Sequence, residues 1–293
     1  MKRVEIMGYR GYPLVGYFWE NVLKPRGIVQ IIHGMQEHAK RYDDFAKFLN
    51  GKGYVVFASD LRGHGETIND IEKQGFSEGD IFEEIVNDQI IISNTLKEKY
   101  NLPLYVVGHS FGSFVTQMYM TKCNIADKIV LSGSTYTRNL SFKFGNLVAH
   151  INGAVVGKNK TAKFLEKNSF GAYGKKFKNG NWLTRDEEIF KAYKLDPYCG
   201  HPFPYSFYKS MFSGTAKNYK DIDKIRSDVK ILIISGDSDP VGGYGKLVTK
   251  LYNVYRKQGL NVQCKLYNGA RHEILNETNK VEVYDDVLNF FND

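Results

Sequence analysis

The feature that most constrains the fold of this chain is the regular alternation of short apolar runs with longer segments of helical periodicity. The apolar runs, rich in Val, Ile and Leu, predict buried strands, and the segments between them predict helices. Such an alternation produces a mostly parallel sheet flanked by helices. The sequence therefore predicts an α/β fold. We expect the chain to begin with two antiparallel strands within residues 1–20. We expect strands at residues 27–32, 54–59, 104–107, 128–131, 230–234 and 262–266, and helices at about 42–50, 81–100, 110–122, 245–258 and 282–291.

Residues 135–220 interrupt this alternation. They contain scattered Gly, Asn and Lys with aromatic pairs and no clean strand pattern, which indicates an inserted cap. Two further segments, residues 1–134 and 221–293, would then form one core. The insertion holds fifteen Lys and Arg against five Asp and Glu, a net charge of +10 in a chain of net charge +8. The core is left with −2, so the basic character belongs to the cap.

The charge of the cap has two interpretations. Blocks of like charge often serve only to solvate a surface. The alternative is attraction of an anionic substrate or of an anionic membrane surface. No RNP, zinc-finger or helix-turn-helix pattern accompanies the charge, so we expect no nucleic-acid partner.

The remaining composition indicates a cytoplasmic protein. No apolar run approaches the ~18 residues that cross a bilayer, and Met1–Glu5 is not followed by the apolar segment of a signal peptide. Three widely separated cysteines, Cys123, Cys199 and Cys264, support neither a disulfide framework nor a Cys-x-x-Cys metal site. We expect neither a metal nor a cofactor.

The most informative motif is Gly108-His-Ser-Phe-Gly112, which lies between a predicted strand and a predicted helix. A Gly-x-Ser-x-Gly sequence in this context forms a strained turn that exposes the serine hydroxyl above the sheet. The glycines keep side chains out of the crowded bend. Ser110 is therefore a candidate nucleophile, whereas His109 should point away from it.

A serine nucleophile needs a base and a carboxylate that orients the base. On this kind of fold the order along the chain is serine, acid, histidine. His272 follows the last predicted strand and is the candidate base, while Asp237 and Asp239 both follow the strand before it. Pro240 makes the backbone after Asp239 rigid, and an aspartate beside a Gly turn commonly caps backbone amides, as Asp237 would. We therefore favour Asp239.

The attacked carbonyl becomes an oxyanion, which requires two backbone amide donors. Phe111 supplies one because it follows the nucleophile, and Met35, in the loop after the strand at 27–32, supplies the other. His33 and His38 in the same loop lack a third metal ligand, so we expect them to brace the loop. A zinc-protease helix is also excluded, because Asn276 stands where the second histidine would be.

A further loop, Asp60-Leu-Arg-Gly-His-Gly65, follows another strand. We expect Asp60 and Arg62 to hold its turn through charge-assisted hydrogen bonds, with His64 in a structural role. His150 and His201 lie in the cap without an evident partner.

These motifs together resemble the α/β-hydrolase fold, and within it the monoacylglycerol lipase and lysophospholipase-like group, also labelled serine aminopeptidase S33 or Hydrolase_4. The resemblance implies a triad of Ser110, Asp239 and His272, with Met35 and Phe111 at the oxyanion hole. It also implies a cap at the position of residues 135–220. The motifs that carry the resemblance are residues 33–38, 60–65, 108–112, 236–239 and 269–272.

We expect a serine carboxylic-ester hydrolase that acts on monoacyl lipids or lysophospholipids through an acyl-enzyme. Its partner would be a small ester or lipid, with peripheral contact of the cap with an anionic membrane surface. Two alternatives stay open: an aminopeptidase, to which Asp186, Glu187 and Glu188 could contribute carboxylates for an α-ammonium group, and a catalytically silent binding protein on the same scaffold.

Overall fold

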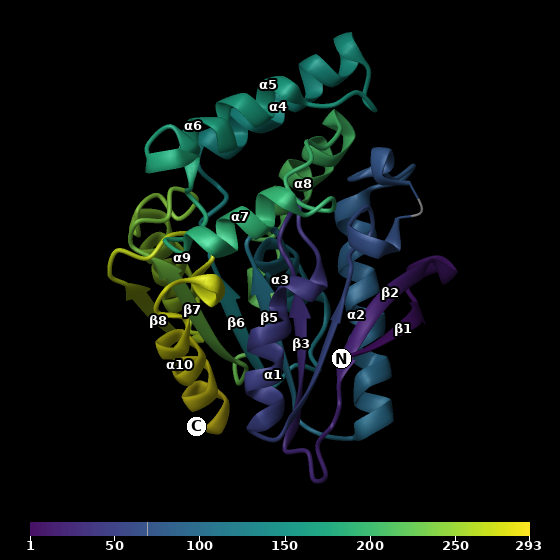
Figure 1. Ribbon diagram of the computed structural model, residues 1–293, viewed down its shortest axis with the longest axis vertical. Coiled ribbons are helices and arrows are strands. Elements are labelled where there is room, and N and C mark those ends of the chain that lie inside the picture. The colour runs from purple at the N-terminus through teal and green to yellow at the C-terminus, as the bar shows by residue number, and fades with distance from the viewer. Residues whose placement is uncertain (69) are drawn as a thin grey trace.

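The fold is built on one eight-stranded sheet (Figure 1). The structure is a computed structural model that describes residues 1–68 and 70–293. Strand order is β1-β2-β4-β3-β5-β6-β7-β8; β1 and β2 pair antiparallel, as do β2 and β4, and the other neighbours are parallel. The mostly parallel sheet and its antiparallel opening are thus confirmed. The strands are β1 (Lys2–Met7), β2 (Pro13–Trp19), β3 (Gly27–Ile32), β4 (Tyr54–Ser59), β5 (Leu104–His109), β6 (Lys128–Ser132), β7 (Lys230–Gly236) and β8 (Asn261–Tyr267).

Helices cover both faces of the sheet (Figure 1). Helices α1 (Asp43–Gly51) and α10 (Lys280–Asn292) pack on one face, and α2 (Ile81–Tyr100), α3 (Phe111–Lys122) and α9 (Lys246–Lys257) pack on the other. Strands between two helical layers are buried on both sides, which is why β3, β4 and β5 are continuous apolar runs rather than alternating ones. The predicted helices are present, although α10 begins at Lys280, two residues before the predicted start.

The chain between β6 and β7 adds no strand to the sheet. It forms α4 (Leu140–Val156), α5 (Lys163–Asn168), α6 (Phe170–Gly174), α7 (Glu187–Leu195) and α8 (Tyr205–Lys217). Figure 1 shows α4, α5 and α6 beyond one end of the sheet, with α7 and α8 nearer the strands. We call residues 135–220 the cap; that they form a separate unit stays a prediction. Short 3-10 helices lie at Tyr9–Gly11, Ala39–Tyr42, Gly65–Thr67, Ile71–Lys73, Lys178–Gly180, Ile222–Lys224 and Ile274–Asn276.

The loop at residues 60–65 is held from inside the core, as the sequence predicted. Asp60 is fully buried, and its carboxylate accepts hydrogen bonds from the amides of Ala39 at 2.8 Å and Glu66 at 2.7 Å. Arg62 forms a two-point ion pair with Asp88 of α2 at 2.6 and 2.9 Å. Among the described residues, no helix is both long and apolar enough to cross a membrane.

Helix α3 begins in very close contact with the end of β3. A Cβ atom added at Gly112 would overlap the carbonyl oxygen of Ile32 and would lie 2.5 Å from that of His33. Both atoms belong to the backbone, which cannot move without displacing the strand. Only glycine allows α3 to start at this position, immediately after Ser110.

We predict that Gly112→Ala lowers the free energy of unfolding by about 3 kcal/mol, because overpacking against fixed backbone forces the helix away from the strand. Urea denaturation followed by circular dichroism measures this. Gly171→Ala in α6 is the matched control: its Cβ would lie 3.5 Å from the nearest atom, an ordinary contact. That control should leave stability unchanged or slightly higher. Equal unfolding midpoints for Gly112→Ala and the unmodified chain would contradict the prediction.

Candidate active site

Ser110 occupies a strained turn between β5 and α3. Its φ of 51° and ψ of −119° are rare for a residue with a side chain. The turn is fixed from two sides: the Ser110 amide donates to the carbonyl of Ser132 in β6 at 2.9 Å, and a Cβ at Gly108 would collide with Thr116 in α3. Backbone strain therefore holds the Ser110 hydroxyl clear of the sheet, as the motif predicted.

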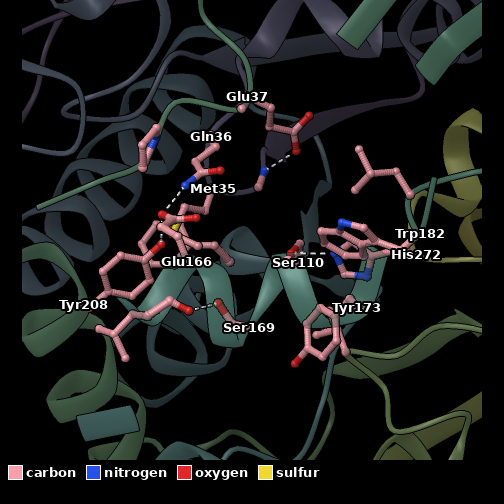
Figure 2. A pocket seen from close by; sticks show the side chains of 18 of the residues that line it. Met35, Gln36, Glu37, Ser110, Glu166, Ser169, Tyr173, Trp182, Tyr208 and His272 are labelled. Carbon is pink, nitrogen blue, oxygen red and sulfur yellow. Dashed lines mark hydrogen bonds between the residues drawn. The ribbon is translucent and has the colours of Figure 1, made fainter. Parts of the chain in front are cut away.

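The structure brings Ser110, His272 and Asp239 together in one hydrogen-bonded chain. Figure 2 shows the contact between Ser110 and His272. His272 Nε2 lies 2.8 Å from Ser110 Oγ, and His272 Nδ1 lies 2.9 Å from Asp239 Oδ2. Asp239 is fully buried, and its carboxylate also accepts hydrogen bonds from Ser235 Oγ at 3.1 Å and from the Val241 amide at 2.8 Å. These donors fix the carboxylate that orients the imidazole.

The neighbouring aspartate has a different environment. Asp237 Oδ1 accepts a hydrogen bond from the Gly269 amide at 2.8 Å, at the turn that follows β8. It thus caps a backbone amide, as expected of an aspartate beside a turn. The structure places Asp239, not Asp237, against His272.

The electrostatic environment of His272 favours its protonated form. Burial lowers the pKa of His272, but the Asp239 carboxylate raises it, with smaller contributions from Glu273 and Glu37, and the net pKa lies above the ordinary value near 6.5. An imidazole beside a buried carboxylate is thus able to take a proton from Ser110 and hold it.

The two predicted oxyanion donors flank Ser110. Phe111 is the first residue of α3, so its amide has no carbonyl partner within the helix. Met35 follows Gly34, where an added Cβ would lie 3.2 Å from Ser110 Cβ, so the loop passes directly over the nucleophile. Met35, Phe111 and Ser110 line the same cavity. Their donor role stays a prediction.

A buried ion cluster, which sequence reasoning missed, braces this site. Arg41 donates to Glu37 at 2.7 Å and forms two hydrogen bonds of 2.8 and 2.6 Å with Glu273, next to His272. Glu37 in turn accepts from the amide of Gly34 at 2.5 Å and from Tyr42 at 2.8 Å. The cluster therefore connects the loop that carries Met35 to the loop that carries His272.

The two carboxylates of this cluster respond differently to burial and to Arg41. Burial raises the pKa of Glu37 and outweighs the effect of Arg41. For Glu273, burial raises the pKa, but the Arg41 guanidinium dominates and lowers it to about 2. One guanidinium thus neutralises one carboxylate and is shared with a second.

The other core histidines are buried and do not compete with His272 as bases. Burial lowers the pKa of His64 to about 4 and that of His109 to about 3, and lowers that of His33 well below its ordinary value. His33 contacts the carbonyl of Gly34 at 2.7 Å and accepts from the Leu61 amide at 3.0 Å, a bracing role. His109 lies 3.2 Å from Ser132 Oγ instead of the nucleophile.

One group of side chains among the described residues has ligand atoms close enough to hold a metal ion. His38, Asp196 and Cys199 place these atoms within 4.8 Å of one another. No sequence motif indicated this group, because Asp196 and Cys199 lie in the cap, far along the chain from His38. His38 Nε2 is hydrogen-bonded to Asp196 at 2.8 Å, so a cation would have to break this contact. Arg41 adds an unfavourable positive charge, since it acts electrostatically on Cys199.

Ser110 opens into a cavity of about 810 Å³ between the core and the cap. Aromatic and aliphatic side chains form much of its wall, and three carboxylates, Glu37, Glu166 and Glu273, also line it. Figure 2 shows Trp182 and Tyr173 beside His272, and Glu166 with Tyr208 farther along the cavity. The apolar lining residues include Met35, Phe111, Phe114, Phe142, Phe144, Phe164, Leu165, Met211, Phe212 and Val241.

Comparison with a solved structure agrees with this geometry. A thermostable carboxyl esterase from Bacillus coagulans superimposes with a TM-score of 0.90 at 25% identity, over 99% of this chain and 97% of the esterase. The class of protein is therefore a serine hydrolase of the α/β-hydrolase fold.

Sequence comparison gives the family. The chain belongs to the family described as serine aminopeptidase S33 (Hydrolase_4), whose profile matches residues 23–279. A monoacylglycerol lipase of Mycolicibacterium smegmatis is 27% identical over 97% of this chain and 94% of its own length. A monoglyceride lipase homolog of Monkeypox virus is 26% identical over 90% of this chain and 88% of its own length.

We predict that Arg41→Met destabilises the protein by about 3–5 kcal/mol at pH 7, because it leaves two carboxylates buried without a cation. In the unmodified chain the contribution of Glu273 is present above pH 4.5 and is lost as the pH falls toward 2, its folded pKa. In the variant the unpaired carboxylates take up protons at higher pH, so the destabilisation should be smaller at pH 5 than at pH 7. Urea titrations at both values measure it.

Lys47→Met on α1 is the control for this prediction, because Lys47 forms only an exposed ion pair with Asp43. Its effect should stay within about 0.5 kcal/mol at both pH values. A destabilisation by Arg41→Met that is equally small would show that the buried cluster contributes little.

Proposed function

We propose that this chain hydrolyses carboxylic esters of monoacyl lipids through a covalent acyl-enzyme on Ser110. The observation that carries the proposal is the continuous hydrogen-bonded chain from Ser110 Oγ through His272 to buried Asp239, which opens into a largely apolar cavity. This arrangement combines an activated nucleophile with a binding site for an alkyl chain.

The proposed reaction has two halves. His272 Nε2 takes the proton of Ser110 Oγ while this oxygen bonds to the ester carbonyl carbon, and the carbonyl oxygen gains negative charge between the amides of Met35 and Phe111. When the tetrahedral intermediate collapses, the C–O bond to the leaving alcohol breaks and His272 returns the proton to that alcohol. A water molecule, deprotonated by His272, then releases the fatty acid and regenerates Ser110.

The apolar cavity wall is evidence that the substrate has a long acyl chain. Side chains of α4, α5 and α8 supply an apolar surface beyond Ser110, including Phe142, Phe164, Met211 and Phe212. Each buried methylene of an alkyl chain contributes about 0.8 kcal/mol to binding. A monoacyl lipid therefore gains affinity from this wall that a short ester does not.

The position of Glu166 is evidence that the substrate has a polar but uncharged head group. It lines the cavity, and three donors reach the same oxygen, Oε1: Gln36 Nε2 at 2.6 Å, the Phe203 amide at 3.3 Å and the Tyr208 hydroxyl. The other oxygen of the carboxylate can accept from a substrate hydroxyl, whereas it would repel a phosphate. This favours a glycerol ester over a lysophospholipid, and the M. smegmatis relative bears the name monoacylglycerol lipase.

The same carboxylate favours the second candidate, an aminopeptidase, because Glu166 could also bind the α-ammonium group of a peptide. The family description includes that activity. The apolar wall is the observation that argues for an acyl ester. The acidic run 186–188 of the peptidase hypothesis does not line the cavity. Its first residue, Asp186, instead caps the start of α7 by accepting hydrogen bonds from the Glu188 and Ile189 amides.

We predict that Ser110→Ala lowers the hydrolysis of monoacylglycerols and of p-nitrophenyl butyrate by about 10⁴-fold or more, because the nucleophile is lost. Ser227→Ala, a change at an exposed serine, should leave the rate unchanged. Fatty acid release and nitrophenol absorbance measure the two reactions. Amino-acid naphthylamides and a lysophospholipid serve as competing substrates.

Each outcome separates one hypothesis from the others. Faster turnover of naphthylamides than of esters would favour the peptidase. Failure of a fluorophosphonate probe to label Ser110, together with no turnover of any substrate, would indicate a silent binding protein. Undiminished ester hydrolysis by Ser110→Ala would refute the proposed mechanism.

We also propose that α4 contacts an anionic lipid surface. Its outer face carries a stripe of apolar side chains, each 53–83% exposed: Leu140, Phe144, Leu147, Ile151 and Val155. Exposed lysines lie on α4 at position 143, in the segment after it at 158 and 160, and on α5 at 163 and 167. An amphipathic helix with lysines near its apolar face binds membrane interfaces in two ways: its apolar side chains are buried in the lipid, and its lysines are attracted to anionic head groups.

We predict that the Leu147→Glu, Val155→Glu double variant binds vesicles of phosphatidylglycerol and phosphatidylcholine at least tenfold more weakly, because neither charged side chain can enter the interface. Co-sedimentation measures the binding. Neither residue lines the cavity, so turnover of soluble p-nitrophenyl acetate should be unchanged. Val281→Glu, at an exposed position on α10, is the control. Equal vesicle binding by the unmodified protein, the double variant and Val281→Glu would exclude α4 as the membrane contact.

A further inference from the structure

Gln36 has an unusual backbone conformation next to a proposed oxyanion donor. It follows Met35 directly, and its φ of 59° lies in the left-handed region that residues with a side chain rarely adopt. Such a conformation persists only where the surrounding structure enforces it. The contacts of Gln36 identify what enforces it.

The backbone carbonyl and the side-chain amide of Gln36 both form hydrogen bonds with the cap. Its carbonyl oxygen accepts from the amide of Gly200 at 3.0 Å, and its side-chain Nε2 donates to Glu166 Oε1 at 2.6 Å. Figure 2 shows the Gln36 side chain directed at Glu166, with Met35 beside it and Ser110 across the cavity. Gln36 is 5% exposed, so these hydrogen bonds are shielded from water.

The cap holds the same loop at a second point, since His38 Nε2 contacts Asp196 Oδ2 at 2.8 Å. On the opposite side, Glu37 accepts a hydrogen bond from the Gly34 amide within the loop and bonds to Arg41 of the core. Three consecutive residues therefore alternate in direction: Gln36 and His38 bond to the cap, and Glu37 bonds to the core. Both sets of contacts therefore act on the residues that directly follow Met35.

We propose that Gln36 is a positioning residue through which the cap holds the Met35 amide in the orientation that stabilises the oxyanion. The inference rests on the proposed function of Ser110 and Met35. The cap then acts on the chemical step as well as on access of the substrate: if its contacts with Gln36 are lost, one oxyanion donor loses its preorganisation. Electrostatic stabilisation of this kind depends on donors that are fixed before the reaction begins.

The test uses p-nitrophenyl acetate, whose short acyl group and absent glycerol reduce direct contact with the cap. For Gln36→Ala we expect kcat to fall about tenfold with KM within twofold of the unmodified enzyme, because the interaction strengthens only in the transition state. Affinity for an alkyl boronic acid, which mimics the tetrahedral intermediate, should fall by a similar factor. Removal of a complete oxyanion donor costs about 10²–10³-fold, so a displaced donor should cost less.

Gln74→Ala is the matched control. Gln74 also ties the core to the cap, through a 3.4 Å hydrogen bond to the Pro197 carbonyl, but it lies outside the oxyanion loop. We expect this variant to retain kcat and boronic acid affinity, because the Met35 backbone is not held by Gln74. A tenfold loss of kcat in Gln74→Ala would show that any weakening of the cap has the effect, which would overturn the specific role of Gln36.

Gln36→Gly separates the side chain from the backbone, because glycine adopts the left-handed conformation without strain. An equal loss of kcat in the Gly and Ala variants supports the side-chain tie to Glu166. Full activity in the Gly variant would overturn it, as would full activity in Gln36→Ala. If Ser110→Ala hydrolyses the acetate as fast as the unmodified enzyme, the proposed function itself fails, a result distinct from those at Gln36.

Discussion

The candidate site depends on one geometric constraint, the convergence of parallel strands at a single edge of the sheet. Strands β5, β7 and β8 all run in the same direction, so the residues after their carboxyl ends meet although they are far apart in sequence. Ser110 and His272 are separated by 162 residues and are hydrogen-bonded. The sharp turn at Ser110 completes this arrangement, because α3 can begin beside β3 only where Gly112 leaves room for the backbone.

Buried charge connects the loops that this convergence brings together. Arg41 bonds to Glu37 near the predicted oxyanion hole and to Glu273 beside His272, and all three side chains are almost inaccessible to water. Burying ions is costly unless they are paired with good geometry. The cluster meets this condition through at least three hydrogen bonds from one guanidinium. The cluster therefore links the position of the Met35 amide, a predicted oxyanion donor, to that of the His272 imidazole.

The cap has a net positive charge, but its basic and acidic side chains lie in different places. Its lysines are exposed, whereas Glu166, the one cap carboxylate that lines the cavity, bonds to Gln36 in the loop after β3. The surface suits an anionic lipid interface and the interior suits an alkyl chain with a neutral polar end. Under the proposed function, the charge on the surface of the cap and the charge inside it serve different interactions, which the net charge of +10 does not separate.

The sequence by itself determined the sheet elements, the turn at Ser110 and the residues of the candidate triad, because apolar periodicity and turn chemistry are local properties of a chain. It also determined the loop in which Met35 and His38 lie. Only the tertiary structure decided the helices of the cap and the pairings of Arg41 with Glu273 and of Gln36 with Glu166. The chain has forty basic and thirty-two acidic residues, and distance in space decides which of them form ion pairs. Arg41 and Glu273 are 232 positions apart, and no local sequence pattern indicates that they pair.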